Sequence, residues 1–378
     1  MRSGHRKPHG RTVSLAAGYT AFVPAPLPPA FEWNRELVNA LSAADRAIGR
    51  LAGESRRLPN PHLLIRPFIR REAVLSSRIE GTQSTLTDLL AAEAGARVAR
   101  DSADLHEVTN YVRALDHSVK KLETLPLSLR LVRETHRLLM TGVRGEAAAP
   151  GEFRSTQNWI GPPGCRPETA TYVPPPPEAV PDCLQHWERF LHDESLPPLI
   201  HAGLAHAQFE AIHPFRDGNG RVGRLVTTLL LVERNVLKAP LLYLSAWFEA
   251  TRPEYYARLL GTTAAGEWHE WLVYFLYGVA REAEDAARRI RTIDRLMLRW
   301  RTQLTTGKSR APETVLELFR ENPFWTTTGI ARRLGIAFTT AARAIERLQA
   351  AGIVSPTGDA QRNRVFCATQ MLEVLERR

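Results

Sequence analysis

Apolar residues recur at three- and four-residue spacing from about residue 36 to residue 301. This is the period of an α-helix with one buried face, whereas the strict alternation of a half-buried strand is nearly absent. We therefore expect an all-α body. The predicted helices cover about 36–53, 68–80, 103–121, 127–140, 178–192, 198–212, 220–234, 252–264 and 267–301.

Proline and glycine interrupt this pattern in two places. Four prolines between Pro24 and Pro29 predict an extended lead-in, and we expect residues 1–30 to be flexible. Residues 151–177 hold three glycines and seven prolines, too many for a helix. Within them, residues 157–160 and 170–173 resemble the two arms of a short hairpin. A linker is expected at 305–309, after the last long helix.

The C-terminal segment follows a different plan, with helices predicted at 312–321, 327–334 and 338–351. Ile353-Val354 and Arg364-Val365-Phe366 read as short strands on either side of a turn. A sharp turn at Gly335 between the second and third helices is typical of a winged helix-turn-helix. We consider two roles for this module, DNA contact or docking to a protein partner. The DNA-contact candidates are Arg343, Arg347, Arg362 and Arg364.

Composition places the chain among soluble globular proteins. It has 378 residues, 44% of them hydrophobic and 24% charged, which favours two domains or one large domain with an appendage. The net charge is +10; four basic residues lie in the first eleven positions, and residues 281–310 hold nine basic against four acidic residues. The segment after Ala311 carries nine basic against seven acidic residues, so charge alone is weak evidence for nucleic acid.

Three widely spaced cysteines argue against a disulfide framework or a zinc cluster, and they fit a reducing cytoplasm. No apolar stretch is long enough to predict a signal peptide or a membrane span. We therefore expect a cytoplasmic protein with no membrane partner.

The chemistry of the chain is concentrated in residues 213–224, His-Pro-Phe-Arg-Asp-Gly-Asn-Gly-Arg-Val-Gly-Arg. Histidine exchanges a proton near neutral pH, and a carboxylate four residues later suits a hard cation. The glycines let backbone N–H groups approach an anion at the start of the next helix, and two arginines share one face of it. Each residue alone has an ordinary structural explanation, but the joint spacing predicts a nucleoside triphosphate site.

All defined positions of these twelve residues match the Fic family pattern, H-x-F-x-D/E-G-N-G-R-x-x-R. Upstream, the residues from Ser76 through Glu80 to Gly81 resemble the inhibitory-helix pattern S/T-x-x-x-E-G/N of Fic proteins that carry this helix on the N-terminal side. Residues 153–161 resemble the target-docking flap of the family. The flap residues are then Gln157, Asn158, Trp159 and Ile160.

This resemblance implies a mainly α fold, a Fic-type helical core with a short β-hairpin flap, followed by a C-terminal winged helix-turn-helix domain. The flexible N-terminus would cover 1–30, and an N-terminal helical region with the inhibitory helix 31–100. The core would cover 101–303 and the winged helix 311–378.

The resemblance also implies a protein adenylyltransferase that uses ATP and Mg²⁺. A Ser, Thr or Tyr hydroxyl of a target protein, or of the chain itself, would attack the α-phosphorus and expel pyrophosphate. A homodimer is expected. In this assignment His213 accepts the hydroxyl proton and Asp217 holds Mg²⁺. The α- and β-phosphates are bound by Gly218, Asn219 and Gly220. Arg221 stabilises the transferring phosphates, Arg224 binds the γ-phosphate, and Phe215 anchors the loop in the core.

Glu80 stands where a helix ends before Gly81, and the helix dipole disfavours a carboxylate there by about 0.3–1 kcal/mol. This hints at a cationic partner, which the resemblance identifies as Arg224. A guanidinium held by Glu80 cannot also bind the γ-phosphate, so competition for Arg224 would act as a switch. Ser76, one turn earlier, would hydrogen-bond near the phosphates or near Glu80.

Two further alternatives stay open. Tyr255 and Tyr256 either line an adenine pocket or pack in the core. The chain as a whole could instead be a DNA-binding regulator whose Fic core only senses nucleotide, or it could transfer another moiety such as UMP or phosphocholine.

Overall fold

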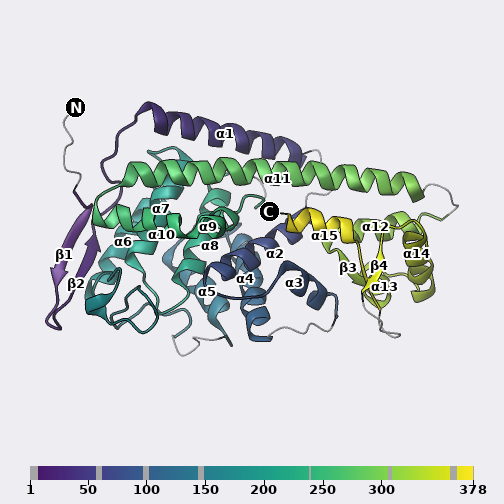
Figure 1. The fold of residues 1–378 in the computed structure, drawn as a ribbon, viewed down its shortest axis with the longest axis horizontal. Coiled ribbons are helices and arrows are strands. Elements are labelled where there is room, and N and C mark those ends of the chain that lie inside the picture. The colour runs from purple at the N-terminus through teal and green to yellow at the C-terminus, as the bar shows by residue number, and fades with distance from the viewer. Residues whose placement is uncertain are drawn as a thin grey trace. The chain divides into compact units, whose positions relative to one another are not determined.

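The computed structural model describes residues 7–56, 62–96, 102–143, 149–237, 240–304, 309–357 and 364–377. The chain forms two compact units. The first comprises Met1–Ile48, Asn110–Lys238 and Leu242–Glu282, and the second comprises Gly49–Thr109, Ala239–Leu241 and Ala283–Arg378. Residues of three long helices belong to both units: α1 (Arg35–Arg56), α4 (Ser102–Lys121) and α11 (Trp268–Leu304) (Figure 1).

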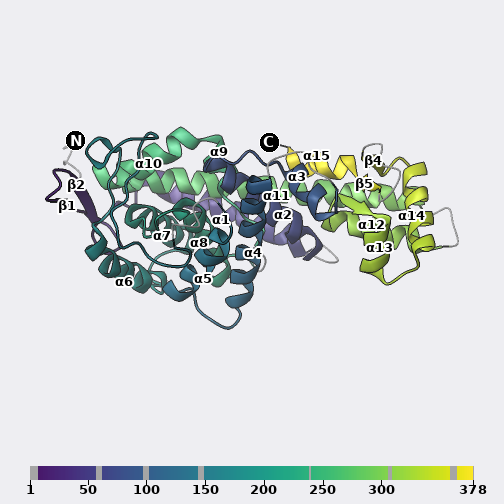
Figure 2. The same cartoon turned by 90° about the horizontal axis from the view of Figure 1, so that it is seen from below.

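The first unit is built around α7 (Pro198–Ile212), which is buried on nearly all sides. Such a helix is apolar all round, and the sequence of α7 has this character. The helix α8 (Asn219–Glu233) packs on α7, and Figure 2 shows the two among the other helices of the unit. Those are α5 (Leu129–Met140), α6 (Val180–Leu191), α9 (Ser245–Ala250) and α10 (Arg252–Ala264), with the short 3-10 turns η2 (Pro167–Thr169) and η3 (Pro177–Ala179).

The N-terminal stretch that we expected to be flexible contains an antiparallel pair, β1 (Gly10–Ser14) and β2 (Thr20–Pro24). The Phe22 N–H of β2 also donates to the Val173 carbonyl at 2.9 Å. Val173 lies at the end of the predicted hairpin, whose arms do pair through a bridge between Ile160 and Tyr172. We call residues 157–173 the flap. The β1–β2 pair thus lies directly beside the flap.

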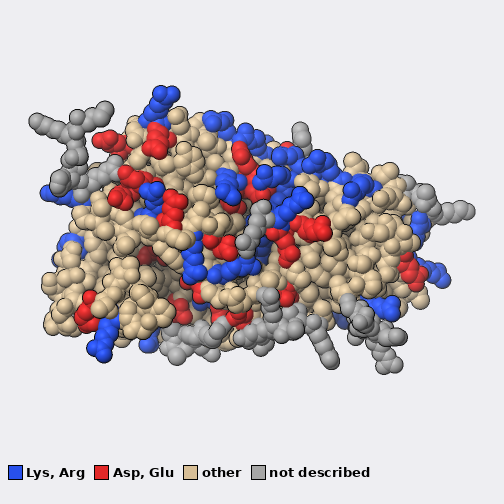
Figure 3. Space-filling model, viewed as in Figure 1, with Lys and Arg blue, Asp and Glu red and all other residues tan. Residues whose placement is uncertain are grey.

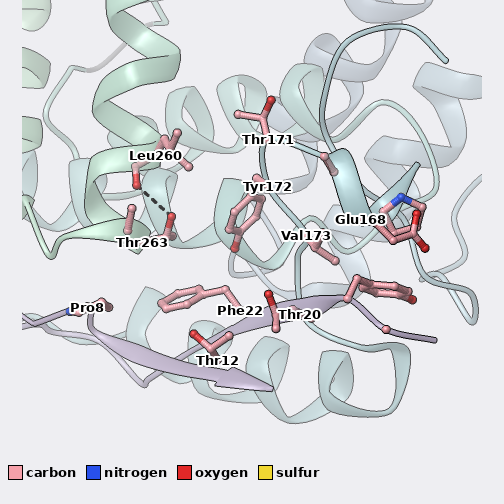
Figure 4. A pocket seen from close by; sticks show the side chains of 16 residues that line it. Pro8, Thr12, Thr20, Phe22, Glu168, Thr171, Tyr172, Val173, Leu260 and Thr263 are labelled. Carbon is pink, nitrogen blue, oxygen red and sulfur yellow. Dashed lines mark hydrogen bonds between the residues drawn. The ribbon is translucent and has the colours of Figure 1, made fainter. Parts of the chain in front are cut away.

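A cavity of about 450 Å³ lies between the β1–β2 pair, the flap and the end of α10 (Figure 4). Its walls carry aromatic rings and threonine hydroxyls. In Figure 4, Phe22 of β2 and Tyr172 of the flap face one another across it, with Thr263 of α10 at a third side. The cavity belongs wholly to the first unit.

The second unit joins α2 (His62–Ile79) and α3 (Leu86–Glu93) with the C-terminal elements. The helix α2 packs on α3, on α12 (Ala311–Glu321) and on α15 (Thr369–Glu376). This grouping differs from the expected order of domains along the chain, because α2 and α3 bury their apolar faces against C-terminal helices and β3. The remaining elements are α13 (Thr327–Leu334), α14 (Phe338–Ala350) and an antiparallel sheet of order β3-β5-β4, with β3 (Phe324–Thr326), β4 (Ser355–Thr357) and β5 (Val365–Cys367).

The prediction of a mainly helical fold is confirmed, and every predicted helix overlaps an observed one. One predicted strand was misplaced. Ile353 and Val354 precede β4, and their side chains are buried after the turn at Gly352, whereas the ladder to β5 begins at Ser355. The apolar side chains of Ile353 and Val354 are therefore explained by their burial and not by strand pairing. Most of the expected linker, residues 305–308, lies outside the described residues.

Three short helices, α3, α9 and α15, were not predicted from the sequence. For α3 a signal existed, since Thr85 and Asp88 form a capping box in which each side chain accepts the other's backbone N–H. Among the described helices, none has both the length and the apolar character needed to cross a bilayer. Cys165, Cys183 and Cys367 are free thiols.

Candidate active site

The candidate site lies where α7 ends and α8 begins. His213 caps the C-terminus of α7 with φ of 48°, in the left-handed region that non-glycine residues rarely adopt. Gly218 caps the N-terminus of α8 with φ of 75°, which glycine adopts without strain. A Cβ at Gly218 would lie 2.8 Å from Met140 Sδ, so the chain also approaches α5 too closely for another residue. The loop 213–218 is therefore tightly constrained.

Asn219 closes this loop with its side chain. Its Oδ1 accepts the Phe215 N–H at 2.8 Å, and its Nδ2 donates to the Phe215 carbonyl at 2.8 Å. Phe215 itself is fully buried, as expected of an anchor. The Asn219 amide is thus engaged with the loop, whereas we had expected it to face a phosphate. Backbone N–H groups at the start of α8 are further donors for an anion.

His136 of α5 contacts the same loop, and no pattern in the sequence predicted this role. Its ring stacks on Phe215 with centroids 3.7 Å apart and planes 4° apart. The Gly151 N–H donates to His136 Nδ1 at 2.8 Å, so the ring proton is on Nε2, which donates to the Asp217 carbonyl at 3.1 Å. Burial lowers the pKa of His136 to about 4, which keeps the imidazole neutral.

Asp217 presents an exposed carboxylate beside the start of α8. Its Oδ1 accepts the Gly218 N–H at 2.6 Å. Its other oxygen makes no hydrogen bond to the part of the chain that the structure describes, and it is therefore available to a ligand. Asp217 and the half-buried His213 are the two loop residues whose chemistry suits catalysis.

Arg221 and Arg224 follow on α8, and their exposed fractions are only 4% and 3%. Burying two guanidiniums is unfavourable unless negative charge or hydrogen bonds compensate. Both lie near a helix N-terminus, where the dipole adds further positive potential. Burial and, second, the charge of Arg224 lower the pKa of His206 to about 3. The start of α8 therefore holds two buried guanidiniums next to a helix N-terminus, groups of the kind that bind phosphate.

The two tyrosines that we considered for an adenine pocket are placed very differently. Tyr255 is 1% exposed, its Oη lies 2.8 Å from His206 Nε2, and its ring stacks on Phe248 at 4.3 Å. This placement favours the core alternative for Tyr255. Tyr256 is 44% exposed, and the Arg252 guanidinium lies 5.8 Å from its ring centroid. An adenine contact therefore stays a prediction that suits Tyr256 better.

The flap begins directly against the His213 loop. Asn158 Nδ2 donates to the Phe215 carbonyl at 2.9 Å and to the His213 carbonyl at 3.3 Å. Gln157 bonds the Pro174 carbonyl on the opposite arm at 3.0 Å. The next two side chains, Trp159 and Ile160, are 41% and 40% exposed. The structure thus brings Asn158 to the loop and leaves large apolar side chains of the flap accessible.

The residues of the expected inhibitory helix belong to the second unit. The helix α2 ends at Ile79, Glu80 is exposed, Gly81 has φ of 104°, and Ser76 is fully buried. The local geometry is that of a helix terminated by glycine, as the pattern predicts. Arg224 lies in the first unit, and its pairing with Glu80 stays a prediction.

The DNA-contact candidates also belong to the second unit. Arg343 is exposed on α14, Arg347 is half-buried on the same helix, and Arg364 is exposed before β5. Arg362 lies outside the described residues.

A left-handed histidine, an exposed aspartate and two arginines at the start of a helix are thus brought together on a mainly helical scaffold. Family models match this region directly: "Fic/DOC family N-terminal" over residues 38–120 and "Fic/DOC family" over residues 126–231. The chain belongs to the Fic/DOC family.

Among relatives, the chain is 33% identical over 162 residues to the "Protein adenylyltransferase Fic" of Drosophila grimshawi and 32% identical to that of Drosophila virilis. Each match covers 41% of this chain and 31% of the relative, so the chain spans about a third of their length. A Fic family protein from Desulfovibrio desulfuricans G20 has a similar fold, with TM-score 0.59 and 22% identity over 90% of this chain and 98% of that one. Fic-1 of C. elegans has TM-score 0.51 and 23% identity, covering 68% and 74% of the two chains.

Proposed function

We propose that this chain is a protein adenylyltransferase that transfers AMP from ATP to a hydroxyl of a protein, the chain itself included. The observation that supports this most directly is the loop 213–218. It presents His213 and Asp217 immediately before a helix whose first turns carry the buried Arg221 and Arg224. The name of the Drosophila relatives agrees with this chemistry.

In the proposed reaction, the oxygen of a Ser, Thr or Tyr hydroxyl attacks the α-phosphorus of ATP. The new P–O bond forms as the bond from the α-phosphorus to the bridging oxygen of the β-phosphate breaks, and pyrophosphate leaves. His213 accepts the hydroxyl proton. N–H groups at the start of α8, together with Arg221 and Arg224, compensate the charge of the phosphates, since charge compensation and positioning supply most of the rate in phosphoryl transfer.

The residues present fit Mg²⁺. Asp217 offers an exposed carboxylate oxygen, and Mg²⁺ in nucleotide sites is commonly held by one or two carboxylates together with phosphate oxygens. Among the described residues no cluster of three or more His, Cys, Asp or Glu could hold a metal by itself. Mg²⁺ would therefore arrive with ATP, and it would neutralise phosphate charge there.

We further propose that Glu80 restrains the enzyme by pairing with Arg224. The exposed carboxylate at the glycine-terminated end of α2 supports this, because that position is electrostatically unfavourable without a cation nearby. ATP would displace Glu80 from Arg224 before transfer. Replacing Glu80 by glycine removes the competitor and leaves the phosphate site unchanged.

The test is incubation of the purified chain with α-labelled ATP and Mg²⁺, followed by detection of labelled protein. Glu80→Gly should increase labelling over wild type, and adding His213→Ala to that form should abolish it. A matched control is Glu32→Gly, which removes an exposed carboxylate from the segment before α1. Absence of label from the Glu80→Gly form with any divalent metal would refute transfer. Equal labelling in parallel incubations with UTP or CDP-choline labelled in the transferable moiety would favour another donor.

A second candidate function is DNA binding by the C-terminal module. The order α12, α13, α14 and sheet β3-β5-β4, with a left-handed turn at Gly335 between α13 and α14, agrees with a winged helix-turn-helix. The exposed face of α14 carries Phe338, which is 57% exposed, and Arg343. Against this, Figure 3 shows acidic side chains among the basic ones on the drawn face.

DNA binding would be tested by retention of random-sequence duplexes with and without Arg343→Ala. Binding through phosphate contacts should weaken as salt rises, and loss of one arginine should reduce that salt dependence. Sequence-dependent binding without any nucleotidyl transfer would favour a regulator whose core senses nucleotide. If wild type and Arg343→Ala retain DNA equally, the result would instead favour a module that docks a protein partner or forms the expected homodimer.

A further inference from the structure

We propose that Arg154 is a positioning residue that holds the flap and the His213 loop in one arrangement. Its catalytic consequence rests on the function proposed above, whereas its structural consequence does not. Arg154 belongs to residues 153–161, which resemble the target-docking flap of the family, and it precedes residues 157–173, which we call the flap; no role was predicted for its side chain.

Arg154 donates hydrogen bonds to backbone carbonyls of three separate segments. The segments are the start of the first flap arm, the end of the second arm, and the turn that follows α7. The bonds are Nη1 to Thr156 O at 3.4 Å, Nη2 to Pro175 O at 2.6 Å, Nη2 to Ile212 O at 3.3 Å, Nε to His213 O at 2.9 Å and the backbone N–H to Pro214 O at 2.9 Å.

Only an arginine side chain could make the four guanidinium bonds of this set. Its guanidinium offers five N–H donors in a fixed planar fork, whereas an asparagine or glutamine amide offers two and a lysine three on a single atom. Arg154 is 4% exposed, and no carboxylate of the described residues lies within ion-pair distance of it. Its charge is compensated by carbonyl oxygens at the negative end of the α7 dipole. Burial lowers the pKa of Arg154 to about 10, so it stays protonated at neutral pH.

His213, whose carbonyl Arg154 binds, has a strained conformation. His213 has φ of 48°, and a non-glycine residue keeps such a conformation only where its surroundings enforce it. The His213 carbonyl accepts from Arg154 at 2.9 Å and from Asn158 at 3.3 Å. Arg154 and the flap residue Asn158 therefore supply bonds that keep His213 in its left-handed turn. A target hydroxyl guided by the flap would meet His213 at a distance that Arg154 sets.

The experiment compares Arg154→Lys with Arg234→Lys in the full-length chain. Arg234 is a matched control, since its guanidinium also bonds two backbone carbonyls, those of Leu191 and Asp193, both at 2.7 Å. It makes no contact with the flap or the His213 loop in the part of the chain that the structure describes. Asn158→Ala is a milder second variant, which removes only the bonds to His213 and Phe215.

The first measurement is hydrogen exchange of the peptides that cover the flap, and it needs no enzyme activity. The amides of Ile160 and Tyr172 bond one another's carbonyls, so they report whether the arms stay together. We expect exchange of flap peptides to accelerate by about tenfold or more in Arg154→Lys, and less in Asn158→Ala. Arg234→Lys should exchange at the wild-type rate in these peptides.

The second measurement is labelling from α-labelled ATP, with each variant placed in the Glu80→Gly form. We expect kcat to fall on the order of 100-fold in Arg154→Lys with little change in the KM for ATP, because misplaced reacting groups slow the chemical step. A folded Arg154→Lys protein with wild-type flap exchange would overturn the proposal. If that variant fails to fold, wild-type exchange in Asn158→Ala would overturn it equally.

The two proposals can fail separately. Absence of label in the Glu80→Gly parent would refute transfer, while accelerated flap exchange would still support the role of Arg154. Accelerated exchange with unchanged kcat would show that Arg154 orders the flap without affecting catalysis, and would refute its catalytic part.

Discussion

Acidification should destabilise the first unit through His136, and the size of the effect can be worked out from the structure. In the fold, Nδ1 of this imidazole accepts the Gly151 N–H and Nε2 donates to the Asp217 carbonyl. Protonation of Nδ1 would place its N–H opposite the N–H of Gly151, and the hydrogen bond between these two groups would be lost. The perturbation is a change from pH 8 to pH 5, in wild type and in His136→Gln. Glutamine offers an accepting oxygen and a donating NH₂ group but does not titrate in this range.

The pKa of His136 is lowered from 6.5 to about 4 by burial. The folded state therefore binds fewer protons than the unfolded state, so the stabilisation is complete above pH 6.5 and decreases as the pH falls toward 4. At 1.36 kcal/mol per pKa unit, the whole shift corresponds to about 3 kcal/mol, of which roughly 2 kcal/mol is lost at pH 5.

The assay is urea unfolding of both proteins at pH 8 and pH 5. Other titrating groups are common to both, so their contributions cancel when the two decreases in unfolding free energy are subtracted. Wild type should lose roughly 2 kcal/mol more than His136→Gln between these pH values. An equal decrease in both proteins would refute the reasoning, because it would mean that His136 titrates normally in the fold.

Three further outcomes follow from the packing of α8 and α10. Gly223→Ala should lower the unfolding free energy by about 1 kcal/mol in urea titrations, since a Cβ there would lie 3.1 Å from the buried Phe209 ring as well as 2.3 Å from Glu210 Oε1; an unchanged midpoint would show that both side chains move aside freely. Tyr255→Phe should cost about 1–2 kcal/mol by leaving His206 Nε2 unpaired, yet leave ATP affinity in fluorescence titration unaltered. Tyr256→Ala should show the opposite, weaker ATP binding at unchanged stability, and wild-type affinity would remove Tyr256 from the adenine pocket.

The helical body could be predicted because each helix buries one face, and this burial repeats along the chain as a period. The prediction was poorest where structure depends on partners distant in sequence. The contact of β2 with the flap is an example, since the Phe22 N–H bonds the carbonyl of Val173, which is remote in the chain. The strand assigned to Ile353 and Val354 was wrong because these side chains fill a core, while the pairing partner of β5 begins at Ser355.

The candidate site shows the same division. His213, Asp217, Arg221 and Arg224 lie within twelve residues, so their spacing alone was enough to predict a phosphate site. The residues that hold them come from elsewhere in the chain. His136 lies on α5 and Arg154 lies before the flap, and both act on backbone carbonyls, which every residue has. A backbone carbonyl can accept a hydrogen bond whatever the side chain of its residue. The accepting positions therefore show no preferred residue type, and no sequence motif marks them.

The order of residues by itself determined the helices, the membership of the family and the chemical groups of the site, because all three are encoded in local periods and spacings. Only the tertiary structure decided that Asn219 closes the loop, that Tyr255 belongs to the core, and that a buried arginine supports a strained histidine. Those assignments depend on which backbone groups meet after folding, and such meetings join segments that have no common pattern in the sequence.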